Sequence, residues 1–347
     1  MNPEKATRCV VAANAELDAN RNIIAVPEMS SSRLNSRQID DYEKYRIDFM
    51  SWLLNFGKDP SSAKGYSPYT VYADSQRTAA FDRWVWESHG RYTIPPDESD
   101  ANAYFEEVAI SDRSEITKGK IEESLTHYGR WLAANSGGDP WELDYSFDSS
   151  GGWKRRPKDY LRREERRAVR EVALNYGGDS WKFTSLVWAG LDAGLRPAEV
   201  MRAKTYWVDK DNHILRIPAE DDTKGEGNWE TSITDRTHRA LIEWLDERAE
   251  TGQYDGTDTL WLTRRGNPYA SKSLGRLLRR LCEEAGIDTT HRHLPWYAIR
   301  HSVGTLMSEE RGLKAAKDQL RHMSPRSTMK YDQVSNETRE EVLNRMG

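Results

Sequence analysis

Apolar side chains recur at helical spacing through most of the chain, in two blocks separated by a polar stretch that contains glycine. The first block predicts four amphipathic helices, because its apolar residues stand three or four positions apart. These helices are expected at residues 37–57, 67–88, 98–110 and 114–134. They would form a helical domain over residues 36–138, and the Asn-, Ala- and Ser-rich residues 1–35 are interpreted as a flexible arm.

The second block, residues 161–347, combines helical spacing with short strand-like runs. Helices are expected at residues 162–176, 181–193, 236–249, 271–285, 298–310, 313–320 and 336–346. Three short strands are expected at residues 206–208, 214–217 and 231–233. The predicted fold class is therefore mainly α with a small antiparallel β-sheet. A helical N-terminal domain would be joined to a mixed α+β C-terminal domain by a linker at residues 139–160.

Composition and charge narrow the class of protein. No run of 18 apolar residues occurs and no signal-peptide pattern opens the chain, so a cytoplasmic protein is predicted. The two cysteines cannot form a disulfide framework. Residues 1–154 carry 17 basic against 25 acidic residues, whereas residues 155–347 carry 34 against 31. The net charge of −5 therefore does not exclude a nucleic-acid partner, because the distribution of charge matters more than its sum.

Candidate chemistry gathers at three places in the second block. Arg196 precedes Pro197 and Glu199 at a predicted helix start. A guanidinium beside the positive end of a helix suits a phosphate, although a capping or salt-bridging arginine is the ordinary alternative. A later helix opens with the sequence Tyr-Ala-Ile-Arg-His at 297–301. Further on, Leu-Arg-His at 320–322 is followed by a tyrosine nine positions after the histidine.

This order and spacing resemble the tyrosine recombinase family, which includes phage integrases and the Xer-like and archaeal enzymes. The chain matches the family pattern at Arg196, Glu199, Arg300, His301, His322 and Tyr331. It departs from the pattern at Tyr297, where the family has His, and at Arg321, where the family has Gly. Some relatives, archaeal ones among them, are similar in having Tyr-x-x-Arg. The resemblance implies a catalytic domain at residues 161–347 and a SAM-like, core-binding DNA-binding domain at residues 36–138.

The resemblance also implies a mechanism. Tyr331 would be the nucleophile of a 3′-phosphotyrosyl intermediate, while Arg196, Arg300 and His322 stabilise the charge that develops on the phosphate oxygens. A Lys in a β-hairpin turn would protonate the leaving 5′ oxygen. Lys224 lies in that turn, Lys210 in the preceding turn is the second choice, and a solvated hairpin tip is the alternative. The chain has no Walker-type loop and no metal-ligand spacing, so no cofactor and no metal are expected.

Four neighbouring side chains receive supporting interpretations. Tyr297 is included among the catalytic residues, with a hydroxyl that bonds the phosphate or orients the nucleophile, and with plain packing as the alternative. A phenol has an ordinary pKa near 10 and is a poor base at neutral pH. Glu199 would brace the basic cluster, and His301 would orient the site or support structure. His291 or His293, just upstream, is an alternative replacement for the missing His.

Double-stranded DNA is the predicted partner. The expected DNA-binding residues are Lys154, Arg155, Arg156, Lys158, Lys118 and Lys120. Residues 66–136 carry 7 basic against 12 acidic residues, which is unusual for a DNA-facing module. As the resemblance implies, subunits would form a homo-oligomer on DNA, a tetramer in the synapse. The helix at 336–346 would dock on a neighbouring protomer or, alternatively, pack in cis.

The predicted function is a site-specific DNA recombinase or integrase, with two alternatives. One is a catalytically impaired, recombinase-derived DNA-binding protein, because Tyr297 replaces a His. The other is a type IB topoisomerase-like DNA relaxer, which would use the same chemistry.

Overall fold

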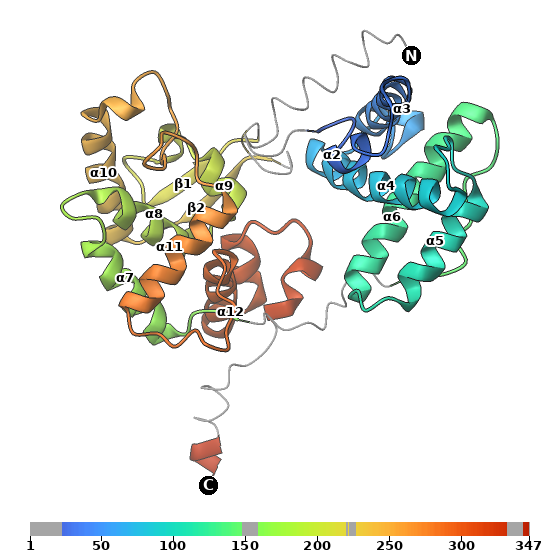
Figure 1. The fold of residues 1–347 in the computed structure, drawn as a ribbon. Helices are drawn as coiled ribbons and strands as arrows, with labels where there is room; N and C mark the ends of the chain where they lie inside the picture. Colours follow the sequence, from blue (N-terminus) through green and yellow to red (C-terminus); the bar gives the residue numbers. More distant parts are fainter. Residues whose placement is uncertain (1–22, 148–158, 220, 222–226, 332–342, 347) are drawn as a thin grey trace. The chain divides into compact units, whose positions relative to one another are not determined.

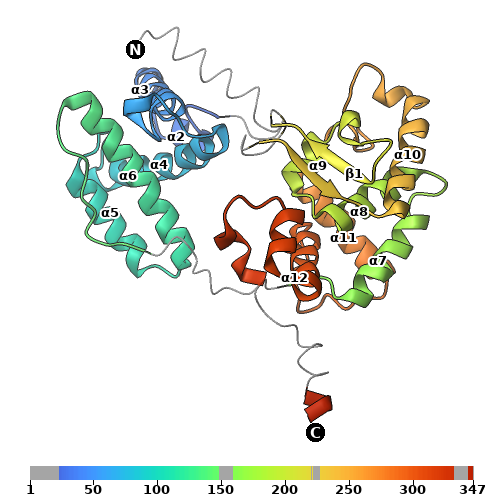
Figure 2. The ribbon, with the colours of Figure 1, turned by 180° about the vertical axis from the view of Figure 1, so that it is seen from behind.

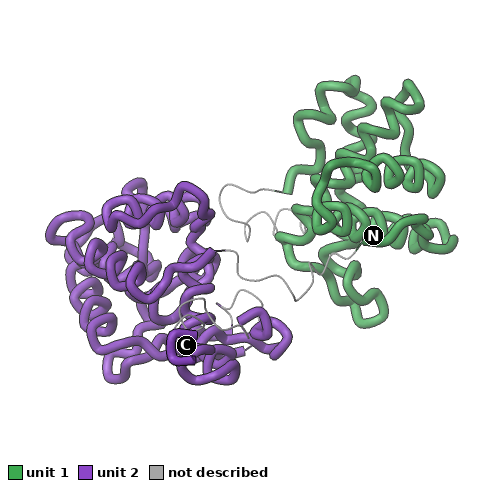
Figure 3. The backbone as a smooth tube through the Cα atoms, turned by 90° about the horizontal axis from the view of Figure 1, so that it is seen from below, with its two compact units in different colours: residues 1–152 green, residues 153–347 purple. Residues whose placement is uncertain are grey.

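The chain divides into two compact units, residues 1–152 and 153–347 (Figure 3). The computed structural model describes residues 23–147, 159–219, 221, 227–331 and 343–346. The division falls within residues 139–160, the segment expected to be a linker, of which residues 148–158 lie outside the described ranges. Each unit has a hydrophobic core of its own.

Unit 1 is a helical bundle (Figure 1). Its helices are α2 (Glu28–Ser31), α3 (Ser36–Asn55), α4 (Pro68–His89), α5 (Glu98–Ile110) and α6 (Glu115–Ser136), and a 3₁₀ turn, η1 (Pro60–Ser62), follows α3. The four longer helices lie within two residues of the ranges predicted from apolar spacing. Ser67 caps α4, because its hydroxyl accepts the backbone N–H of Thr70. Aromatic rings fill the core, among them Phe49, Phe81 and Tyr128.

The described part of the expected N-terminal arm belongs to this bundle. Ile23 is buried in the core of unit 1, and residues 28–31 form α2. Apolar spacing did not indicate this, because a helix of one turn has no period to detect. Residues 1–22 of the expected arm lie outside the described residues.

Unit 2 surrounds a central helix (Figures 1 and 2). Its helices are α7 (Arg163–Asn175), α8 (Trp181–Ala193), α9 (Pro197–Arg202), α10 (Asp235–Ala249), α11 (Ser271–Glu284) and α12 (Tyr297–Gln319), with 3₁₀ turns η2 (Thr205–Trp207), η3 (Gly252–Tyr254), η4 (Pro325–Ser327) and η5 (Met329–Tyr331). α8 packs against α7, α10 and α12, and it is buried along most of its length. A helix that is apolar on nearly every side is stable only in such a position.

The sheet of unit 2 is an antiparallel pair, β1 (Ile214–Ile217) and β2 (Trp229–Ser232), in which Ile214 faces Ser232. The predicted fold class, mainly α with a small antiparallel sheet, is confirmed. The strand predicted at residues 206–208 was wrong: residues 205–207 form η2, and Val208 makes one isolated bridge to Leu215. Trp207 is buried and its indole donates to Asp221, so tertiary packing determines the local conformation.

The helices predicted at 298–310 and 313–320 are two helical segments of α12 that meet at Gly312, whose φ of 80° breaks the helix. Of the helix predicted at 336–346, the structure describes residues 343–346, which are helical. Within the described ranges, no helix has the length and apolar character needed to cross a bilayer.

Candidate active site

The site begins at the end of α8. Gly194 ends this helix in the left-handed conformation, with φ of 59°. The turn brings Arg196 to the N-terminus of α9, directly before Pro197. The Arg196 guanidinium donates to Glu199 Oε1 at 2.6 Å, and its side chain keeps 17% of its surface exposed. Arg196 is therefore within reach of an anion from solvent.

Glu199 is the centre of a cluster of three arginines. Its carboxylate is buried, and Oε2 lies 2.9 Å from Arg321 Nη2 and 3.9 Å from Arg300 Nη1. Burial raises the pKa of Glu199, but Arg321, Arg300 and Arg196 outweigh this effect and lower the pKa to about 2. One carboxylate among three guanidinium groups leaves the cluster with a net positive charge, which suits a phosphate.

Arg300, in the first turn of α12, joins separate parts of the site. Its guanidinium is fully buried and donates to the backbone oxygens of Gly194, at 2.7 Å, and Leu320. Its Nε has no hydrogen-bond partner among the described residues. Burial lowers the pKa of Arg300 to about 10, so it remains a cation at neutral pH.

Arg321 stands where the family pattern has a glycine, and its backbone has a conformation that glycine favours. Its φ is +55°, in the left-handed region that glycine favours. The buried side chain donates to the backbone oxygens of Ala193 and Gln319, at 2.8 and 2.9 Å, as well as to Glu199. This departure from the family pattern therefore adds a third guanidinium to the cluster around Glu199.

Tyr331 lies on η5 with its ring against α12. The side chain is buried, and its hydroxyl lies 3.1 Å from His301 Nδ1. A Cβ on Gly304 would lie 2.5 Å from Tyr331 Cζ, so the ring fits only because residue 304 is glycine. Burial raises the pKa of the phenol, and the nearby Arg300 opposes this effect. Tyr331 therefore belongs to the same cluster as the arginines.

His322 stands beside Tyr331. Its ring is parallel to that of Tyr331 with centroids 6.3 Å apart, and its Nδ1 lies 2.9 Å from the hydroxyl oxygen of Thr328. Burial and then Arg300 lower the pKa of His322 to about 3, so the imidazole is neutral at pH 7. The structure thus brings together four predicted positions: Arg196, Arg300, His322 and Tyr331.

Two contacts of Tyr331 were missed by the sequence analysis. His301, interpreted as a supporting residue, touches the hydroxyl directly, and burial together with Lys330 and Arg300 lowers its pKa to about 4. The Lys330 ammonium lies 5.0 Å from the centre of the Tyr331 ring and 5.8 Å from that of Tyr297. Burial and then Arg300 and Arg196 lower the pKa of Lys330 to about 8.

Tyr297 is half-buried and packs on His301. The two rings meet edge to face with centroids 5.0 Å apart, and within the described residues the Tyr297 hydroxyl has no hydrogen bond. His291 and His293 are exposed, and neither ring is hydrogen-bonded to Tyr331. The geometry thus favours packing for Tyr297 and gives no support to a catalytic role for the two upstream histidines.

The predicted lysine of the hairpin lies between β1 and β2 in the chain, but Lys224 is outside the described residues. Lys210, the second choice, is exposed in the turn before β1. The linker residues Lys154, Arg155, Arg156 and Lys158 are also outside the described residues.

The two lysines proposed for DNA contact in unit 1 differ. Lys118 was wrongly expected at the surface: it is buried, and its ammonium donates to the backbone oxygen of Ala109 at 2.7 Å. It also lies 5.4 Å from the Phe147 ring centre, so inward contacts hold it. Lys120 is exposed in part and pairs with Glu123.

A basic surface on α11 was not singled out from the sequence. One side of this helix is buried through four leucines, and the other exposes Lys272, Arg276, Arg279 and Arg280. The signal was present in the sequence, because leucines at helical spacing with basic residues between them describe an amphipathic cationic helix.

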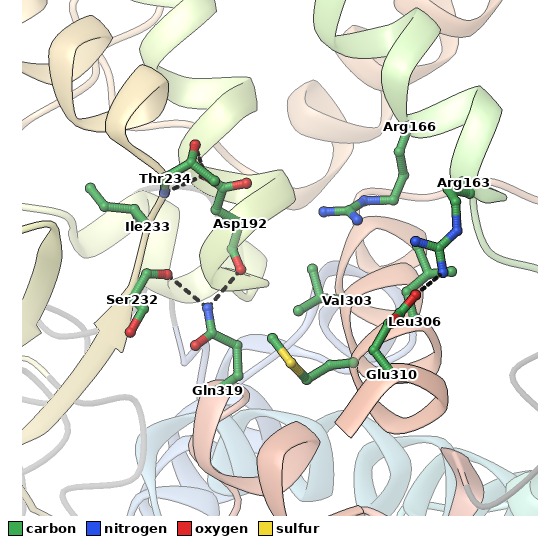
Figure 4. Close-up of a pocket in the computed structure, with 11 residues that line it drawn as sticks. Arg163, Arg166, Asp192, Ser232, Ile233, Thr234, Val303, Leu306, Glu310 and Gln319 are labelled. Carbon is green, nitrogen blue, oxygen red and sulfur yellow. Dashed lines mark hydrogen bonds and ion pairs between the residues drawn. The ribbon is translucent and has the colours of Figure 1, made fainter. Parts of the chain in front are cut away.

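A hollow of about 320 Å³ lies between α7, the end of α8, β2 and α12 (Figure 4). Gln319 lies on one side of it and donates to the backbone oxygens of Asp192 and Ser232, both at 2.8 Å. Arg163 and Arg166 line its other side. None of the predicted catalytic residues that the structure describes lines this hollow.

Comparison with known proteins agrees with this geometry. Residues 178–338 match the profile of the phage integrase family. The type 1 fimbriae regulatory protein FimE of Escherichia coli K12 is 29% identical over 175 residues, which are 50% of this chain and 84% of FimE. FimE of Shigella flexneri is equally similar. Residues 178–338 therefore carry a phage integrase, or tyrosine recombinase, family domain, which supports the resemblance that the motifs predicted.

Solved structures show the same fold at low sequence identity. The XerH site-specific recombinase in a post-cleavage complex with palindromic difH superposes with a TM-score of 0.62 and 16% identity, over 97% of this chain and 94% of XerH. A lambda integrase (75–356) dimer bound to a COC′ core site gives 0.52 and 16%, over 82% and 94% of the two chains.

Proposed function

We propose that this protein is a site-specific DNA recombinase that cleaves and rejoins strands through a 3′-phosphotyrosyl intermediate on Tyr331. The observation that carries the proposal is the position of the Tyr331 hydroxyl, which is hydrogen-bonded to His301 in the cluster that contains Arg196 and Arg300. The family domain at residues 178–338 supports recombination as the activity. The XerH structure contains a palindromic difH substrate and the lambda integrase structure a COC′ core site, which supports DNA as the partner proposed here.

The cluster offers a complete set of contacts for a phosphodiester. Arg196 is partly exposed and its guanidinium is anchored through Glu199, so this cation is placed to meet a nonbridging oxygen of a phosphate. In the tautomer in which Nδ1 of His322 accepts from the Thr328 hydroxyl, the proton of the neutral ring is on Nε2, which can donate to another oxygen. These donors stabilise the charge that grows on the phosphate during attack.

In the proposed reaction the Tyr331 oxygen attacks phosphorus and the bond to the 5′ oxygen breaks. The leaving oxygen takes a proton, for which we propose Lys224 on the basis of the family resemblance. Because the phosphate remains an ester, the 5′ hydroxyl can later attack it and restore the strand without ATP.

For DNA binding we propose the exposed basic face of α11, together with the linker residues Lys154, Arg155, Arg156 and Lys158, and Lys120. Cations on one face of a helix, without a carboxylate between them, suit the phosphate backbone of a groove. We also propose a homo-oligomer on DNA, a tetramer in the synapse, and a cytoplasmic location.

The test is covalent trapping. Nicked suicide duplexes tiled across the DNA that flanks the gene are incubated with the full chain in excess EDTA, and adducts are resolved under denaturing conditions. Wild-type protein should form an adduct with at least one duplex, and Tyr331→Phe should bind that duplex equally well without forming one. An adduct with Tyr331→Phe would assign the nucleophile to another residue. Binding by wild type without any adduct would favour the impaired DNA-binding protein, for which Tyr297 is the motivating feature.

A further inference from the structure

The chain lacks the histidine that the family has at the start of its H-x-x-R motif. Tyr297 stands there, and one phenol does not deprotonate another at neutral pH, because both have an ordinary pKa near 10. His301 follows four residues later on α12, so it lies on the same side of the helix one turn further on. Its Nδ1 is 3.1 Å from the Tyr331 hydroxyl, which has no other hydrogen bond within the described parts of the chain.

Several contacts hold this pair in place. The ring of Tyr331 rests on Gly304, and the backbone N–H of Tyr331 donates to the backbone oxygen of Thr328 at 2.8 Å. The ring of Tyr297 meets His301 edge to face and limits the rotation of the imidazole. The hydrogen bond is thus built from packed rings on α12 and η5, which fixes the distance between donor and acceptor.

From this geometry we propose that His301 is the catalytic base that accepts the proton of Tyr331, in place of the missing histidine at position 297. The assignment rests on the proposed function, because it supplies a base to the same nucleophile. The proton moves from the tyrosine oxygen to His301 Nδ1 as the oxygen–phosphorus bond forms. The bond to the 5′ oxygen breaks and that oxygen is protonated by the acid proposed above. On rejoining, His301 returns its proton to Tyr331.

The charges around His301 explain how it would act only on bound DNA. The Lys330 ammonium and the Arg300 guanidinium face it, together with the phenols of Tyr297 and Tyr331, and among the described residues no carboxylate is hydrogen-bonded to it. In the free protein these cations and burial keep the imidazole neutral. A phosphodiester anion placed among the same cations offsets their charge, so protonation of His301 becomes easier when the substrate is present.

The experiment compares His301→Ala and His301→Asn with wild type in single-turnover cleavage of the suicide duplex selected above. The Asn Oδ1 atom takes nearly the place of His Nδ1 and can accept the hydrogen bond, but it does not take up a proton at these pH values. We expect both variants to be slower by about 100-fold or more at pH 7, with DNA affinity and melting temperature close to wild type. His291→Ala, at an exposed histidine, is the matched control and should cleave normally.

Two further measurements separate a base from other roles. The wild-type rate should fall as the pH is lowered through the pKa of the imidazole, and His301→Asn should lack this acid limb. A duplex with a 5′-bridging sulfur has a leaving group that needs no proton. Both variants should still cleave this duplex more slowly than wild type, because His301 is proposed to act on Tyr331 and not on the leaving group.

Three results would overturn the assignment. A wild-type rate for His301→Ala would remove His301 from the chemistry, and a wild-type rate for His301→Asn would reduce it to a positioning residue. Full rescue by the bridging sulfur would place it at the leaving group instead. In each case wild-type adduct formation and its loss in Tyr331→Phe would leave the proposed function standing. Absence of an adduct with wild type would end both proposals.

Discussion

Substitution of Gly304 tests directly whether Tyr331, the proposed nucleophile, is held in the position that the structure shows. An Ala Cβ at this position would lie 2.5, 2.6 and 2.7 Å from three ring carbons of Tyr331. Ordinary contact begins near 3.4 Å, so the ring would have to withdraw by roughly 1 Å. Because the ring is buried, the shift would move the hydroxyl away from His301 rather than let it relax freely.

The expected cost has a kinetic and a structural part. A displacement of about 1 Å at a reacting atom commonly slows chemistry by about 100-fold, so Gly304→Ala should cleave about that much more slowly at unchanged DNA affinity. Overpacking costs about 1–3 kcal/mol, whereas Ala in place of Gly within a helix recovers about 1 kcal/mol. The free energy of unfolding should therefore fall by about 2 kcal/mol at most.

Single-turnover adduct formation and denaturant unfolding together provide the assay. In a Tyr331→Ala background the ring is absent, and Gly304→Ala should then stabilise the protein by about 1 kcal/mol. Gly275→Ala on α11, where no atom lies within 4 Å of the added Cβ, is the control for unfolding and should also stabilise. A Gly304→Ala protein that cleaves as fast as wild type, or faster, would refute the argument that this glycine positions Tyr331.

Two further substitutions test the surroundings of the hydroxyl. Lys330→Met removes a cation that lowers the pKa of His301, so this pKa should rise from about 4. NMR of the imidazole protons measures the pKa, and a fall would contradict the electrostatic argument. Tyr297→Phe keeps the ring that packs on His301, so cleavage should stay within about threefold of wild type, whereas a rate 10–100-fold lower would show that the hydroxyl takes part.

Much of the fold was predictable because helices in both units repeat apolar residues over three or more turns. The four long helices of unit 1 and most helices of unit 2 were found from this spacing alone. The strand predicted at 206–208 failed for the opposite reason: three residues carry too little pattern, and burial of Trp207 determined their conformation. α2 was missed on the same ground, because a single turn has no repeat.

For the candidate site, motif spacing located the positions but not their contacts. Residues 297, 301 and 304 occupy one side of α12 by helical spacing, so a shared face was readable from the sequence. The sequence did not reveal that Tyr331 rests on this face, because η5 follows a separate turn nearly thirty residues further along the chain. Lys330 was overlooked because its importance comes from the rings it covers, which no local pattern reveals.

The two departures from the family pattern, at positions 321 and 297, have different physical consequences. At position 321 a side chain was added where the backbone suits glycine, and left-handed φ costs about 1–2 kcal/mol for an ordinary residue. Its guanidinium bonds the buried Glu199, and removing one partner of such a buried pair costs about 3–5 kcal/mol, which is more than that strain. At position 297 a proton acceptor was lost, and packing alone cannot replace it. An imidazole one turn further along the same helix can, because a base is defined by its distance to the nucleophile and not by its place in a motif.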